Sequence, residues 1–302
     1  MTNPNKIDWT ELQFGVEIEF VGGTPKEIEL LPDWVMSLDE QQIDDTGEES
    51  GSELKPPPMK WAQRDQIRLM LERLRASGAA ANWSCGLHVH VGIELYGQPA
   101  IPSFIDAAVR SQDTMRELLQ TSEDRLIYCP PITEQMREQY HLNPVSDALR
   151  HKGRPQSHRC GINLAAWFDI GTVEYRYANG SLDDEEVLNT IELCLRFTAA
   201  IGAGQLLPND APEPFARALG APLSGYPPIQ SAPRWYKERI WLENALLPAL
   251  APLAQRLIPG SEIHHILPSA SGLTLAIEDV EGIMHRFQLR LTAGEWEVAG
   301  RL

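Results

Sequence analysis

The stretch LQFGVEIEF, from Leu12 to Phe20, decides how the rest of the chain can fold. Apolar residues occupy every second position, which is typical of a β-strand with one face in a core. The other face carries Glu17 and Glu19, so two carboxylates stand roughly 6 to 7 Å apart along the strand. Two like charges this close on one face of a strand repel each other, so their placement calls for an explanation.

Two later stretches repeat this alternation. LHVHVGIEL, residues 87–95, places His88 and His90 on the polar face of a strand, and TVEYRYA, residues 172–178, places Glu174 and Arg176 there. If the three strands share one sheet, their apolar faces must turn toward the same core, and their polar residues gather on the opposite surface. Carboxylates gathered in this way repel one another strongly unless cations neutralise them. The pattern therefore predicts a metal site on a sheet.

The length of 302 residues fits one large domain, or one domain with an appendage. We expect a catalytic domain over residues 1–257 and a small β unit over residues 258–302, where the sequence alternates as GLTLAIEDV, IMHRFQLRL and WEVAGRL. A helix that begins near Arg234 is expected to break at Pro248 and Pro252.

The charge balance limits the class of partner. With 42 acidic and 26 basic residues the net charge is −16, which argues against nucleic acid or an anionic membrane as the main partner. The four cysteines lie far apart and form no C-x-x-C pair, which favours free thiols in a reducing compartment. No apolar run approaches the roughly 18 residues that a membrane span needs. These features predict a soluble, cytoplasmic protein.

The regions between the three strands are less regular. Residues 61–77 and 102–120 have helical apolar spacing and are expected to lie against the apolar face of the sheet. The acidic run from Asp39 to Glu49 is expected to be a solvated loop. Glu53 follows this run and precedes LKPPP, where prolines stiffen the chain, so we expect its carboxylate to reach the site.

The ligand types favour a hard cation bound with a polyphosphate. Glu17, Glu19, Glu53 and Glu174 make an oxygen-rich set, which suits Mg²⁺ or Mn²⁺ better than Zn²⁺. Arg176 shares a face with Glu174 and would be repelled by bound cations unless an anion lay between them. The sequence has neither a P-loop nor G-x-G-x-x-G, so metals and arginines would have to hold a nucleotide.

The ordered motifs FGVEIEF, GSELKPPP, SCGLHVHVG, RCGINL and GTVEYRYANGSLD together resemble the amidoligase family of carboxylate-amine ligases, which is related to glutamine synthetase and glutamate-cysteine ligase. The resemblance covers roughly residues 12–200. It implies an α+β fold in which a curved, mainly antiparallel sheet, backed by helices, holds ATP and Mg²⁺ or Mn²⁺ on its concave face. It also implies a two-step reaction. ATP phosphorylates a small-molecule or peptide carboxylate, and an amine then attacks the acyl phosphate to form a peptide or isopeptide bond.

The resemblance also implies roles for individual residues. The implied metal ligands are Glu17, Glu19, Glu53, His88 and Glu174, with Glu17 and Glu19 each serving a different divalent ion. His90 is implied on the nucleotide side, and Arg176 and Arg159 are implied to contact phosphate. Asn163 is the polar position after Arg159, with a role in binding or in structure. Arg176, Arg159 and Glu174 are the expected catalytic residues.

Two other readings of the sequence stay open. A metal-dependent hydrolase could use the histidines and glutamates around a metal-activated water, although Arg176 and Arg159 would then have no role. A non-catalytic relative could bind nucleotide without turning it over. The sequence identifies neither the carboxylate, nor the amine, nor the base that deprotonates the amine, and it leaves a homo-oligomer open.

Overall fold

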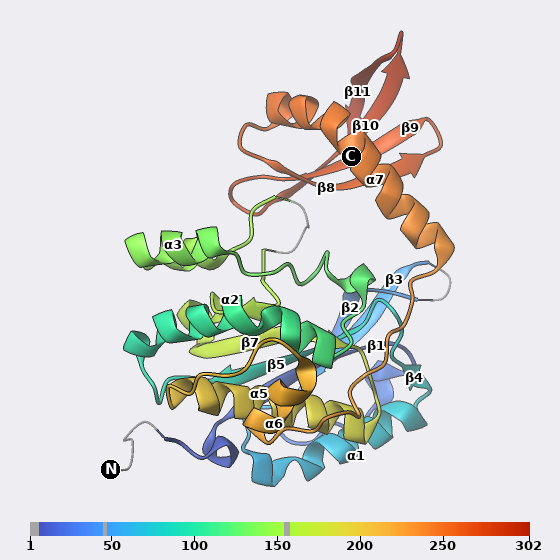
Figure 1. Ribbon diagram of the computed structural model, residues 1–302. Coiled ribbons are helices and arrows are strands. Elements are labelled where there is room, and N and C mark those ends of the chain that lie inside the picture. The colour runs from blue at the N-terminus through green and yellow to red at the C-terminus, as the bar shows by residue number, and fades with distance from the viewer. Residues whose placement is uncertain (1–5, 45–46, 154–157) are drawn as a thin grey trace. The chain divides into compact units, whose positions relative to one another are not determined.

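The computed structural model describes residues 6–44, 47–153 and 158–302, and the chain divides into two compact units (Figure 1). The first unit comprises Met1–His151 and Arg159–Ser231. The second comprises Lys152–His158 and Ala232–Leu302. Every residue predicted for the site belongs to the first unit.

A seven-stranded sheet forms the centre of the first unit. Its strands are β1 (Phe14–Gly22), β2 (Val35–Ile43), β3 (Glu49–Lys55), β4 (Ala79–Ala80), β5 (Gly86–Gly92), β6 (Ile162–Asn163) and β7 (Thr172–Asn179). They follow the order β2-β3-β1-β5-β7-β6, with β4 beside β1, and the pairs are antiparallel. The prediction of an α+β fold with a mainly antiparallel sheet is confirmed at this level.

Helices cover the apolar face of this sheet (Figure 1). Helices α1 (Asp65–Ala76), α2 (Ile101–Leu118) and α5 (Asp184–Gly202) lie on this face, α6 (Pro212–Leu219) packs against α2 and α5, α3 (Glu134–Leu142) packs against α2, and α4 (Ala166–Ile170) contacts β7. The alternating apolar residues of β1, such as Phe14 and Ile18, join one core with the apolar sides of α1, α2 and α5. The predicted helical segments at 61–77 and 102–120 therefore lie where expected. In the described part of the chain, every helix is too short or too polar to cross a membrane.

Strand β2 replaces part of the predicted acidic loop. The expectation of a solvated loop from Asp39 to Glu49 was wrong for residues 39–43, which belong to a strand that pairs with β3 in an antiparallel register. This pairing supplies the backbone hydrogen bonds that an isolated acidic segment would have to obtain from water, and it buries Ile43. Residues 45 and 46 of the predicted loop lie outside the described residues. As a result, Glu40 and Gln42 belong to the sheet.

The second unit is a four-stranded antiparallel sheet with one long helix. Its elements are α7 (Arg234–Leu257), β8 (Glu262–Ser269), β9 (Gly272–Glu278), β10 (Met284–Thr292) and β11 (Glu295–Arg301). The strand order is β11-β10-β9-β8. Leu250 and Leu253 of α7 share a core with Leu275 and Leu289 of the sheet.

Helix α7 departs from the sequence prediction because it continues through Pro248 and Pro252. Proline removes one helical hydrogen bond and crowds the preceding turn, but burial of the following apolar residues against the sheet offsets this cost. All of α7 belongs to the second unit, whose longer segment runs from Ala232 to Leu302, whereas the sequence analysis placed the boundary between residues 257 and 258.

Candidate active site

Cross-strand pairing brings the predicted site residues onto one face of the central sheet. The directly opposed pairs are Glu19 with Glu53, Glu17 with His88, and His90 with Glu174. Residues directly opposite in an antiparallel pair point to the same side of the sheet. Since the alternate residues of β1 are buried in the core, all these side chains project from the face opposite the core.

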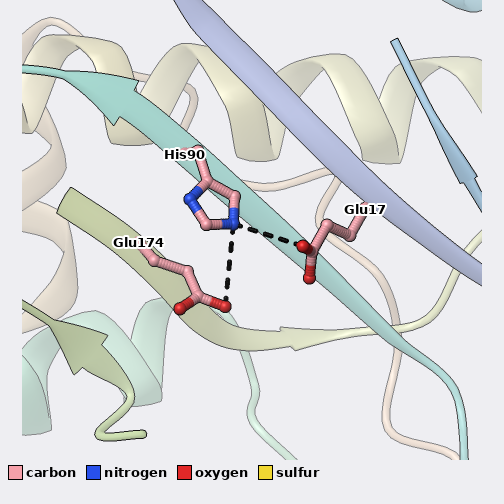
Figure 2. Close-up of side chains that lie close together, drawn as sticks. All are labelled: Glu17, His90 and Glu174. Carbon is pink, nitrogen blue, oxygen red and sulfur yellow. Dashed lines mark ion pairs between the residues drawn. The ribbon is translucent and has the colours of Figure 1, made fainter. Parts of the chain in front are cut away.

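One group with metal-binding geometry consists of Glu17, His90 and Glu174 (Figure 2). The Nε2 atom of His90 lies 3.4 Å from Oε1 of Glu17 and 3.8 Å from Oε1 of Glu174. Its Nδ1 atom lies 3.1 Å from Oγ1 of Thr172, which orients the ring. Nε2 is buried and has no hydrogen-bond partner among the described residues. A buried imidazole nitrogen that faces two carboxylates, with its other nitrogen held, is oriented as a metal ligand.

A second group consists of Glu17, Glu53 and His88. In both groups one ligand atom from each residue lies within 4.8 Å of the others. Nδ1 of His88 lies 3.0 Å from Oε2 of Glu17, whereas His90 faces the other oxygen of the same carboxylate. Glu17 could therefore bridge two divalent ions, one in each group.

Glu19 lies beside the second group without belonging to either one. Its Oε1 atom is 3.7 Å from Nε2 of His88, and its Oε2 atom accepts a hydrogen bond from the Gly86 amide at 2.5 Å. The sequence analysis assigned Glu19 and His88 as metal ligands and His90 to the nucleotide side. In the structure both histidines belong to groups that could hold a metal, and His90 also lines a cavity described below.

Both oxygens of Glu174 are held by neighbouring side chains. Nη1 of Arg176 lies 2.5 Å from Oε1, and Nδ2 of Asn163 donates to Oε2 at 2.7 Å. Glu174 and Asn163 are almost fully buried, and Arg176 is 8% exposed. Asn163 thus orients Glu174, and it does not line either cavity at this face.

The site favours the protonation states that metal binding requires. Burial works to raise the pKa of Glu174, but the charge of Arg176 outweighs it and lowers this pKa to about 2. Burial also opposes ionisation of Glu17, but its interactions with His88 and His90 hold its pKa below the usual range. Burial and the nearby Arg176 lower the pKa of His88. Ionised carboxylates and neutral imidazoles are the forms that bind a cation.

Glu53 differs from the other carboxylates. Its burial and the charge of Glu17 outweigh the attraction of Lys55 and raise the pKa of Glu53 to about 8. At neutral pH this carboxyl group keeps its proton until a cation replaces it.

Metal-free protein is therefore expected to lose stability as the pH rises from about 5 to about 8. The unfolded Glu53 releases its proton near its ordinary pKa of 4.5, whereas the folded group holds it up to about 8, so the native state binds the extra proton in this window. The free energy of unfolding should fall by on the order of a few kcal/mol over this window and should level off above about pH 8. The test is to measure the melting temperatures of wild type and Glu53→Gln in the presence of a chelator from pH 5 to pH 9. We expect the melting temperature of wild type to fall with pH relative to that of the variant. Identical curves for the two proteins would contradict this pKa assignment.

Two cavities open on the face that carries these residues. The first, of about 320 Å³, is polar. It is lined by four carboxylates and four cationic side chains, namely Glu17, Glu19, Glu40, Glu53, Lys55, Arg125, Arg159 and Arg176. Arg159, predicted to contact phosphate, is an exposed residue of this cavity. Residues 154–157 of the basic segment before Arg159 lie outside the described residues.

The second cavity, of about 390 Å³, has mainly apolar walls that include Val16, Pro56 and Ile170. Gly15 and Gly92 also line it. A Cβ atom added at Gly15 would meet no atom within 4 Å, so no side chain covers the backbone at this position. The cavity therefore offers space for a flat or apolar group next to His90.

Lys55 and Arg125 are two cavity residues that the sequence analysis missed. Lys55 follows Glu53 by two positions on β3, so the strand alternation alone could have placed it on this face. Arg125 lies in the connection between α2 and α3, which has no periodic signal. Its buried guanidinium donates to the carbonyl oxygens of Cys85 at 2.5 Å and Arg176 at 3.4 Å. These long-range contacts are what bring Arg125 to the cavity.

Two carboxylate-rich groups that could each hold a metal ion, beside buried arginines on an antiparallel sheet, have the residue types that bind phosphorylated ligands. The comparison with protein families agrees with this class. The model of the family described as "Putative amidoligase enzyme" matches residues 27–198, which include Glu53, both histidines, Glu174 and Arg176. The chain therefore belongs to this amidoligase family, as its motifs predicted. A search of curated proteins found no match.

Proposed function

We propose that this protein is an ATP- and Mg²⁺-dependent carboxylate-amine ligase that forms an amide bond through an acyl-phosphate intermediate. The observation that carries the proposal is the pair of metal-binding groups that share Glu17, with Arg176 beside them. Mn²⁺ would serve in place of Mg²⁺, since both prefer oxygen ligands. The fold we propose is of the glutamine synthetase and glutamate-cysteine ligase type, with the nucleotide on the face opposite the helices.

The charge of the polar cavity supports a polyphosphate ligand. With Glu174 of the adjacent metal-binding group, five carboxylates would face four cationic side chains, so two divalent ions would leave the site positively charged. The phosphates of ATP would neutralise this excess. Arg176 and Arg159 would contact phosphate oxygens, and the two ions would be held by Glu17, Glu53 and His88 on one side and by Glu17, His90 and Glu174 on the other.

The two cavities supply the geometry for phosphoryl transfer. In such a transfer the attacking and leaving oxygens lie on opposite sides of the phosphorus atom. We place the nucleoside in the apolar cavity beside His90 and the acceptor carboxylate in the polar cavity. The cavities meet at Glu17, so the terminal phosphoryl group would pass next to the bound ions.

The proposed reaction balances without a redox partner. A carboxylate oxygen of the substrate forms a bond to the terminal phosphorus, and the bond from that phosphorus to ADP breaks. The amine nitrogen then bonds to the acyl carbon, phosphate leaves, and the nitrogen loses a proton. The protein contributes by orienting the reactants, by charge neutralisation and by shielding the acyl phosphate from water.

The proposal is tested by measuring ADP release from ATP and Mg²⁺ with pooled amino acids, dicarboxylic acids, peptides and amines, and by mass spectrometry of the products. We expect ADP together with a product lighter by one water than the sum of its two parents. Turnover of a substrate without nucleotide would instead support a metal-dependent hydrolase. ATP binding with no ADP across the panel would support a non-catalytic relative.

A further inference from the structure

Lys55 occupies a position that no other cationic residue of the site shares. Among the described residues, only Lys55 and Glu17 line both the polar and the apolar cavity. Arg125, Arg159 and Arg176 line the polar cavity alone. Lys55 therefore lies where the two cavities adjoin, as does Glu17, which the two metal-binding groups share.

The surrounding chain holds this side chain in place. Lys55 is the last residue of β3 and shares a face with Glu53, whose carboxyl group its ammonium contacts. Pro56 and Pro58 follow it and line the apolar cavity, and proline restricts the backbone there. The side chain keeps about a third of its surface exposed, so a ligand that passes between the cavities can reach it.

A phosphoryl group held where the two cavities adjoin would need a cation with several hydrogen-bond donors. The Lys55 ammonium is charged at neutral pH, because the ordinary pKa of lysine is about 10.4. An ammonium group has three rotatable N–H donors and can follow oxygen atoms that move. A divalent ion held by Glu53 would replace the Lys55 ammonium as the partner of this carboxylate and would leave the ammonium available for a phosphoryl oxygen.

We infer that Lys55 is a catalytic residue of the proposed ligase and that its ammonium binds the phosphoryl group during transfer. As the bond between the terminal phosphorus and the ADP oxygen breaks and the bond to the carboxylate oxygen forms, negative charge on the phosphoryl oxygens is met by the Lys55 ammonium. No proton is transferred in this step. The inference rests on the proposed function.

A more ordinary role for Lys55 is that of a counter-ion to Glu53, and the two roles can be separated chemically. All four native cysteines are buried, so a thiol introduced at position 55 would be the reactive one. In Lys55→Cys, 2-bromoethylamine restores an ammonium group on a side chain of lysine-like length. Iodoacetamide adds a neutral group of similar size.

We expect Lys55→Cys to lower kcat for ADP formation by about 10²-fold, the usual effect of losing one group that stabilises developing charge. The dissociation constant for ATP should change much less. Aminoethylation should recover at least about tenfold of the lost kcat, and carbamidomethylation should recover none. Lys60→Cys is the matched control, because Lys60 is exposed and pairs with Glu11 away from the cavities.

Wild-type kcat in Lys55→Cys, or equal recovery with the charged and the neutral reagent, would overturn the role of Lys55 while leaving the ligase proposal intact. If the wild-type protein itself formed no ADP across the substrate panel, the proposed function would fail and the role of Lys55 with it.

Discussion

Replacement of Glu17 by glutamine is expected to lower ATP-dependent turnover by about 10³-fold or more, since it weakens both proposed metal sites at once. Each oxygen of this carboxylate faces a different histidine, and both metal-binding groups include it. An amide has one neutral acceptor oxygen and cannot bridge two cations in the same way. The measurement is ADP release at saturating ATP over a range of Mn²⁺ concentrations.

Glu40→Gln is the matched control for Glu17→Gln. Glu40 lines the same polar cavity but belongs to neither metal-binding group, so its substitution should change turnover by less than about tenfold. Circular dichroism would check that both variants are folded. Normal turnover in Glu17→Gln would remove the shared carboxylate from the mechanism.

Replacement of Arg176 by methionine is expected to have the second large effect, on both stability and activity. It leaves Glu174 charged and buried beside no cation, which should lower the free energy of unfolding of the metal-free protein by about 3–5 kcal/mol. Mn²⁺ should restore much of this loss, because the ion takes the place of the guanidinium next to Glu174. Turnover should remain lost, because methionine cannot bind phosphate. Urea denaturation with and without Mn²⁺ measures the first effect.

A double variant separates the charge effect from the packing effect of Arg176. The double variant carries both Arg176→Met and Glu174→Gln, so it has no unpaired buried charge at these two positions. It should therefore be more stable than the single variant Arg176→Met in the absence of metal. If Arg176→Met alone were as stable as wild type without metal, the buried pair would contribute nothing and the reasoning above would be wrong.

The residues of the catalytic face could be predicted because strand alternation is a local property. β1, β5 and β7 each carry one buried apolar face, and a shift by one residue would bury the charged face, so the register is strongly specified. The resemblance implied two ions, but the residues of each metal-binding group, and the place of Glu17 in both, could not be predicted. They depend on which residues lie directly opposite, including the register shift between Leu87 and Val89 where β5 pairs with β7.

Other parts of the site depend on contacts between residues distant in sequence. The acidic residues of β2 have low strand propensity, and only pairing with β3 makes this segment a strand. Arg125 reaches the polar cavity because Gly86 has no side chain, since a Cβ atom at that position would collide with the guanidinium. Similarly, α7 continues past two prolines because the second sheet packs against it.

The most direct test of the two-ion site is the number of Mn²⁺ ions bound per chain, measured by electron paramagnetic resonance on wild-type protein in the presence of a non-hydrolysable ATP analogue. We predict two ions per chain with a spectrum broadened by spin coupling, because both ions would share the Glu17 carboxylate. A single ion, two uncoupled ions or no binding would contradict the shared two-ion site.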